Sequence, residues 1–290
     1  MINKLIKINW LSVLLILLLF ISGIVSVFSY IDEDEKYQIM YNSYYEECLI
    51  NDTDQCAQYS IPFKTRDTVS TFDRIVTSSM MRNIQIFMPL ILMAIALPNF
   101  YNKFKYGYLK NSLVRDTYRK TLIKMYFDSI KFIMILPIFF LILFIISYIL
   151  SRNFDYSSFH QIYQMIGAGE ENSVHYIRFI ISYMLTFALH GIFWINLAIF
   201  NVRGKTNILI SIVISYIEYS MIFSVGEIIL VPLFRNTSFY YYFSLSMIWS
   251  YYGVTRIGMI IEGIILAFIS TLIVYLHYRN QEKVLEEIEK

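Results

Sequence analysis

The sequence predicts an all-α fold, that of a polytopic membrane protein with six transmembrane helices. Composition and pattern both indicate this class. Of the 290 residues, 57% are hydrophobic and only 16% are charged, which is far from the balance of a soluble globular domain. The apolar residues are also concentrated in uncharged runs of about twenty, the length that a helix needs to cross a hydrocarbon layer of ~30 Å. We therefore expect the whole chain, residues 1–290, to form a single transmembrane domain.

Six runs are long and uncharged enough to be spans, and they are residues 10–30, 83–101, 132–150, 179–200, 207–225 and 257–276. An even number of spans places both termini on one side of the membrane. If that side is the cytoplasm, most of the 24 basic residues fall in the inner segments, as the positive-inside rule requires. We therefore expect both termini to lie inside. The first run is too long for a signal-peptide core, which predicts an uncleaved span.

Residues 31–82 form the predicted extracytoplasmic loop, which contains both cysteines, Cys48 and Cys56. The seven residues between them include turn formers, so a disulfide is expected on this oxidising side of the membrane. A metal site is the weaker alternative, because no histidine lies nearby. Near the end of the loop an apolar repeat at helical spacing predicts an amphipathic helix lying on the membrane or on another outer segment. Its members are Val69, Phe72, Ile75, Val76 and Met80.

The segment 226–256, between the fifth and sixth spans, is too long and too apolar for a plain loop. It is rich in aromatic residues and is interrupted by Pro232 and Arg235. Backbone at membrane depth must satisfy its own hydrogen bonds. We therefore expect a re-entrant helical hairpin before the sixth span.

Enzyme chemistry has no support in the sequence. Neither G-x-S-x-G nor H-E-x-x-H nor C-x-x-C occurs, so no catalytic residue and no metal ligand is assigned. The net charge of +2 is too small to indicate nucleic-acid binding. A nucleotide-binding domain is also missing, so any ATP-driven activity requires hydrolysis on another polypeptide.

The segment 102–131 is the most distinctive inner region. It holds eight basic residues against Asp116 and Asp128. One interpretation is topological, since positive charge keeps a loop inside. The other rests on the order Lys105-Tyr106-Gly107-Tyr108-Leu109-Lys110, followed by a basic turn and an apolar stretch that leads into the third span.

This second pattern resembles the permease subunits of type 2 ABC exporters. Members of that family have six spans with both ends inside, a short helix with an aromatic-Gly-x-Leu-Lys-like stretch after the second span, and a broken hairpin before the sixth. The resemblance implies that 102–131 is a cytoplasmic coupling segment that docks on an ATPase. The implied contact residues are Tyr106, Gly107, Tyr108, Lys110, Asn111, Arg115, Tyr118 and Arg119.

The resemblance also implies the partners and the setting. They are two cytoplasmic ATPase subunits, a second permease copy or homologue, membrane lipid, and a peptide or hydrophobic substrate. ATP and Mg would be bound by the ATPase, with no cofactor on this chain. The bias toward Ile, Lys, Asn, Tyr and Phe suggests a bacterium with an AT-rich genome, hence its plasma membrane.

Ionisable residues inside spans are costly and usually face a bundle interior or a water path. His190 and Glu218 lie at similar depth on two spans joined by a tight turn, and each belongs to a polar stripe. We expect them to form a hydrogen bond, either as contacts between helices or as part of a substrate or proton site. Glu262 lies close enough to the start of its span to reach the interface, so no role is assigned to it.

The function expected from these features is export of an amphipathic or hydrophobic substrate, possible examples being antimicrobial or cytolytic peptides, by an ABC permease subunit. The alternative is a membrane scaffold or sensor that does not transport and whose acidic outer loop binds a partner. An adjacent ATPase gene would favour the exporter.

Overall fold

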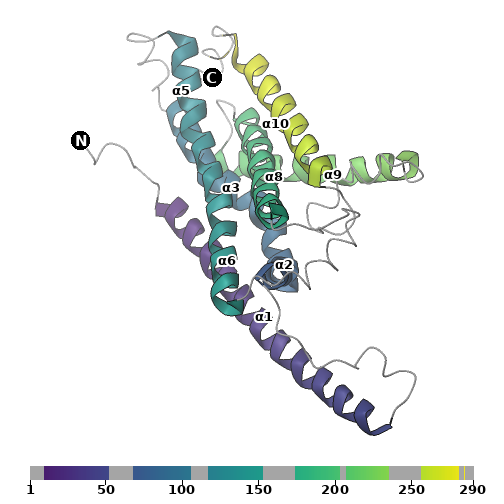
Figure 1. Cartoon of the computed structure of the whole chain (residues 1–290). Coiled ribbons are helices and arrows are strands. Elements are labelled where there is room, and N and C mark those ends of the chain that lie inside the picture. The colour runs from purple at the N-terminus through teal and green to yellow at the C-terminus, as the bar shows by residue number, and fades with distance from the viewer. Residues whose placement is uncertain are drawn as a thin grey trace.

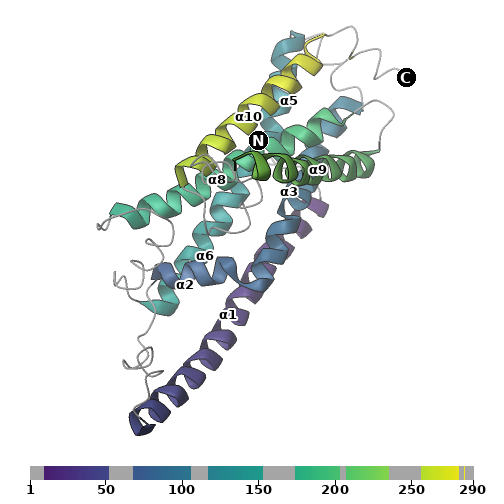
Figure 2. The ribbon, with the colours of Figure 1, turned by 90° about the vertical axis from the view of Figure 1, so that its right-hand side faces the viewer.

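The computed structural model describes residues 10–51, 68–105, 117–152, 174–202, 207–234, 256–280 and 284. Every regular element within these ranges is a helix (Figures 1 and 2). Six candidate spans are long and apolar enough to cross a membrane, and they fall where the sequence predicts them. For the described residues, the predictions of an all-α protein and of six helices long and apolar enough to span a membrane are thus confirmed.

The first span is longer than expected. Helix α1, Trp10–Asn51, has 42 residues and is about 63 Å long. Its second half projects away from the other helices (Figure 1). Residues 31–51, which were expected to follow the first span as part of the outer loop, therefore continue its helix. Their place outside the membrane stays a prediction. The predicted disulfide between Cys48 and Cys56 lies outside what the structure describes, although the Cys48 backbone belongs to the last turn of α1.

The predicted amphipathic helix is present as α2, Thr68–Thr77. Its apolar face, formed by Phe72, Ile75 and Val76, is at most 3% exposed. It lies against α6, where the Phe72 ring meets the Phe144 ring edge to face at a centroid distance of 5.7 Å. The expected partner was the membrane or another outer segment, whereas α2 packs on the spans α6, α3 and α1.

Helix α3, Ser79–Lys105, is the second span and contains two prolines. The third span is preceded by its own amphipathic helix: α5, Tyr118–Ile130, runs through a 3-10 turn, η3, Lys131–Met134, into α6, Ile135–Ser151. The buried face of α5 packs mainly on α3 and consists of Tyr118, Thr121, Met125 and Ser129.

The last three spans are α8, Val174–Phe200, α9, Ile208–Phe234, and α10, Arg256–Tyr278. Helix α9 continues through residues 226–234, which were expected to belong to the re-entrant hairpin, and Pro232 is inside it. The rest of that predicted hairpin, residues 235–255, is outside the described ranges. In both views α9 runs across the other helices rather than along them (Figures 1 and 2).

Helices α3 and α8 form the centre of the bundle, and α8 contacts α3, α6, α9 and α10. Within a membrane, the hydrophobic effect does not drive helices together, so they associate through close packing. Small residues allow that close packing. A Cβ atom added to Gly263 would lie only 2.9 Å from the Leu189 Cβ atom, so α10 approaches α8 closely at this point.

Charged residues are distributed unevenly between the two ends of the bundle. One end, which we call the basic end, holds the last turn of α3, all of α5 and the last turn of α10, with described residues Lys103, Lys105, Arg119, Lys120, Lys124, Lys131 and Arg279. The projecting part of α1 extends from the opposite end (Figure 2), which we call the acidic end after Asp32, Glu33, Asp34 and Glu35.

Candidate functional site

Polar contacts between α8 and α9 converge on Asn201. Its Nδ2 atom lies 2.6 Å from Glu218 Oε2 and 3.0 Å from Ser215 Oγ. The Ser211 hydroxyl donates to the Asn201 carbonyl oxygen across 3.1 Å. The polar stripe predicted on α9 therefore faces the end of α8, and its partner is Asn201, the residue that follows α8.

The expected hydrogen bond between His190 and Glu218 is not formed. His190 Nδ1 lies 2.8 Å from the Thr186 carbonyl oxygen, and because a carbonyl only accepts, Nδ1 is the donor. No described residue bonds to His190 Nε2, while Glu218 is bonded to Asn201. The reason is that α9 crosses α8 (Figure 1), so the two helices do not keep residues of equal depth adjacent.

A second polar group lies where α8, α9 and α10 approach one another. His190, Trp194, Tyr219 and Glu262 are each at most 4% exposed. The Trp194 and Tyr219 rings meet edge to face with centroids 5.8 Å apart. Each of the four has one buried polar atom without a hydrogen-bond partner among the residues described. Glu262 is thus buried rather than at the interface as expected, and such intramembrane groups are typical of functional sites.

A groove of 490 Å³ runs between α9 and α10, with α8 as its floor. Most of its lining is apolar, and the polar exceptions are Asn196, Glu218 and Ser270. Asn196 Nδ2 donates to Ser270 Oγ and to Thr271 Oγ1, each across 2.9 Å. Asn196 Oδ1 is buried and has no partner in the described part of the chain. The groove therefore combines an apolar surface with a few polar atoms, as ligand sites commonly do.

The basic end is tied together by Tyr278, which is fully buried at the end of α10. Its hydroxyl lies 2.8 Å from the Ile199 carbonyl oxygen and 2.9 Å from that of Val202. Its backbone carbonyl accepts a hydrogen bond from the Tyr118 hydroxyl across 2.6 Å. Its ring also meets the Phe104 ring of α3 edge to face. One residue thus connects α3, α5, α8 and α10.

An ion pair reinforces this connection. Lys103 on α3 pairs with Asp128 on α5, and Lys131 lies 3.7 Å from the other oxygen of the same carboxylate. These side chains are partly exposed, so their contribution to stability is modest. Their geometric effect is to hold α5 against the end of α3.

Two of the predicted docking residues are described by the structure. The Tyr118 side chain is 9% exposed and its hydroxyl bonds to Tyr278, so it points into the bundle. Arg119, the next residue, is exposed. The other predicted contacts lie outside the described ranges and are Tyr106, Gly107, Tyr108, Lys110, Asn111 and Arg115.

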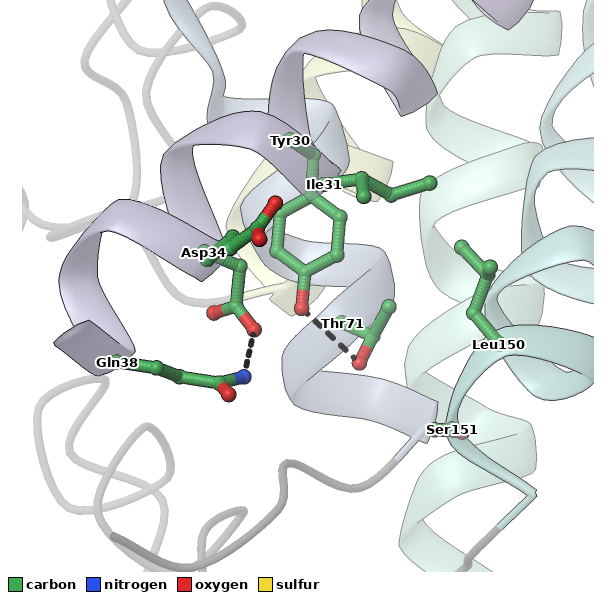
Figure 3. A pocket seen from close by; sticks show the side chains of 8 residues that line it. Tyr30, Ile31, Asp34, Gln38, Thr71, Leu150 and Ser151 are labelled. Atoms are coloured by element: carbon green, nitrogen blue, oxygen red, sulfur yellow. Dashed lines mark hydrogen bonds between the residues drawn. The ribbon is translucent and has the colours of Figure 1, made fainter.

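The acidic end has its own cavity, of 360 Å³, between α1, α2 and the last turn of α6 (Figure 3). The Tyr30 hydroxyl points across it to Thr71 Oγ1 at 3.5 Å, and Gln38 donates to Asp34 across 2.8 Å. The Tyr30 contact ties the base of the projecting part of α1 to α2, while the Gln38 contact lies within α1. Within the described ranges, no group of three or more His, Cys, Asp or Glu side chains could hold a metal ion.

Comparison with known proteins does not assign the chain to a family. No protein-family model matches the chain. Searches of curated proteins and of solved structures likewise return no match. Function must therefore be inferred from the geometry of the site.

Proposed function

We propose that this chain is the membrane-spanning subunit of an ATP-driven exporter for an amphipathic or hydrophobic substrate. The observation that carries the proposal is the connection through Tyr278. This residue joins α5, which follows the predicted docking stretch, to α8 and α10. Both of these helices line the apolar groove.

The connection offers a path for coupling. An ATPase docked on the proposed coupling segment, residues 102–131, would push on α5. Because Tyr118 is bonded to α10, and Tyr278 of α10 is bonded to α8, the displacement would reach two of the three helices that line the groove. Packed helices move as rigid units, so a small shift at one end is transmitted along them.

Charge separation supports the orientation that this mechanism needs. The basic end holds Lys103, Lys105, Arg119, Lys120, Lys124, Lys131 and Arg279. Basic segments are retained in the cytoplasm. We propose that both termini and residues 102–131 are cytoplasmic, in a bacterial plasma membrane. Two ATPase subunits, which bind ATP and Mg, and a second permease copy or homologue would complete the transporter.

Affinity purification from the native membrane in mild detergent tests this proposal. Mass spectrometry of the purified complex is expected to find a soluble ATPase in a stoichiometric amount. A tagged version of another six-span protein from the same membrane serves as the control for nonspecific capture. Recovery of the chain without any ATPase, in a complex that is otherwise intact, would refute the exporter.

One observation favours the alternative function, a membrane scaffold or sensor. Residues 31–47 of α1 form a largely exposed acidic surface beyond the bundle, which suits a basic partner (Figure 1). The same purification separates the two proposals, since a scaffold would recover partners that bind this helix and no ATPase.

A further inference from the structure

In the groove between α9 and α10, the hydrogen-bond donors are already used within the protein, while some acceptors are not. Asn196 uses its amide hydrogens on Ser270 and Thr271. The Ser270 hydroxyl donates to the Ala267 carbonyl oxygen across 3.1 Å, which uses its only hydrogen. What these residues still offer a ligand is therefore acceptors, above all Asn196 Oδ1, which belongs to a side chain only 1% exposed and has no partner among the described residues.

Glu218 adds a second acceptor to the same groove. Asn201 donates to Glu218 Oε2 across 2.6 Å, and the other carboxylate oxygen has no hydrogen bond within the described ranges. Asn201 is a neutral partner, so it satisfies a hydrogen bond without balancing the charge. None of the lining residues that the structure describes is a lysine or arginine. A buried or half-buried carboxylate without a cation is a costly arrangement that a cationic ligand would relieve.

The remaining lining is apolar and comes from all three helices. A space of 490 Å³ falls within the range of sites that bind small molecules. Its groups match a molecule with an apolar body and one strongly donating, positively charged end. An anionic or purely accepting head group would instead face two acceptors with no donor.

We propose that this groove binds an amphipathic amine, whose apolar part lies along α9 and α10 and whose ammonium group donates to Glu218 and Asn196. The claim that the bound amine is also cargo rests on the proposed export function, but binding itself does not. The test therefore uses the purified chain without any ATPase, so failure of the amine site and failure of the exporter can be told apart.

The experiment measures binding of a fluorescent long-chain primary amine to the full-length protein in phosphatidylcholine nanodiscs. The corresponding fluorescent alcohol is the matched neutral probe, since it has the same apolar part. Wild-type protein is expected to bind the amine more tightly than the alcohol. Glu218→Gln should weaken amine binding about 10- to 100-fold, because a charge-assisted hydrogen bond is lost, and should leave alcohol binding unchanged.

Two tryptophan variants locate the site. Ile269→Trp fills the groove from α10 and should weaken binding of both probes, while Ile222→Trp does the same from α9 and replaces it if the first variant does not fold. Ile265→Trp, one turn earlier on α10, is the control, because Ile265 is 41% exposed and does not line the groove.

Three results would overturn the proposal. Equal affinity of the wild-type protein for amine and alcohol would mean that the groove takes only apolar chains, such as those of lipid. Unchanged amine binding in Glu218→Gln would exclude the carboxylate as its partner. No saturable binding of either probe, together with a change in oligomeric state in Ile269→Trp, would mean that a second copy of the chain covers the groove.

Discussion

The hydroxyl of Tyr118 donates a hydrogen bond to the backbone carbonyl of Tyr278 across 2.6 Å. This contact joins the first turn of α5 to the last turn of α10, two segments 160 residues apart in the chain. Coupling between the basic end and the groove depends on it in the mechanism proposed above.

Replacing Tyr118 by Phe removes this hydrogen bond and keeps the ring. The expected loss of stability is about 1 kcal/mol, the usual net value of a buried hydrogen bond. Thermal unfolding in detergent measures it. Tyr275→Phe is the matched control, because that side chain is 46% exposed on α10, the helix that accepts the Tyr118 hydrogen bond. Its effect should stay within about 0.5 kcal/mol. Equal effects of the two variants would remove the special role of Tyr118.

The pair between Lys103 and Asp128 makes a separate prediction. Reversing one charge, in Lys103→Glu, places two carboxylates together and should loosen the contact between α5 and α3. Reversing both, in Lys103→Glu with Asp128→Lys, should restore most of the stability. The coupling energy should be about 1 kcal/mol or less and should fall as salt is added, since the pair is partly exposed. A coupling energy of zero at low salt would contradict the pairing.

The polar contacts of α9 predict which mutations interact. Asn201→Ala and Glu218→Ala remove two partners of one hydrogen bond, so their effects on stability should be non-additive by about 0.5 kcal/mol or more. A double-mutant cycle of His190→Ala and Glu218→Ala is the control, because these two side chains do not contact each other. Their effects on stability should add within about 0.5 kcal/mol. Strong coupling between His190 and Glu218 would restore the pair that the structure does not contain.

The close approach of α8 and α10 at Gly263 makes a further prediction. A methyl group there would press on the Leu189 Cβ atom, which cannot move without its backbone. Gly263→Ala is therefore expected to cost about 1–3 kcal/mol through overpacking. Ile264→Ala changes the neighbouring residue, which is 51% exposed, and is the control. Unfolding curves that coincide for wild type and Gly263→Ala would show that the helices are farther apart.

The six membrane-crossing helices could be predicted because span length and absence of charge are local properties of the sequence. The continuation of α1 could not be read from hydropathy, because residues 31–51 have no apolar run. A weaker signal was present, namely polar pairs four residues apart: Lys36 Nζ lies 2.6 Å from Asp32 Oδ2, and Gln38 bonds to Asp34. Such pairs stabilise an exposed helix.

The polar stripe on α9 was predictable, but its partner was not. The expectation for His190 assumed that α8 and α9 run side by side, so that equal depth means contact. The crossing of the two helices leaves Asn201 as the residue that meets Ser215 and Glu218. A crossing angle depends on packing among several helices, which one sequence does not reveal.

The connection through Tyr278 and the burial of Glu262 were missed for a related reason. Both residues lie near a helix end, where a polar side chain is normally expected to reach the interface. In the folded chain, neighbouring helices cover both residues. Tyr118 and Phe104 pack on Tyr278. Beside Glu262, α8 approaches α10 closely at Gly263.

The most direct test of the exporter is ATP hydrolysis by the complex purified from its native membrane and placed in nanodiscs. Wild type is compared with Tyr108→Ala combined with Arg115→Ala, which leaves seven of the eight basic residues of 102–131 to hold the segment inside. Tyr44→Ala with Lys36→Ala is the control, because it also removes one tyrosine and one basic residue, but from the acidic end. The account predicts that wild type and control recover an ATPase and hydrolyse ATP, while the first double variant inserts normally but loses both. Equal recovery and turnover in all three would contradict it.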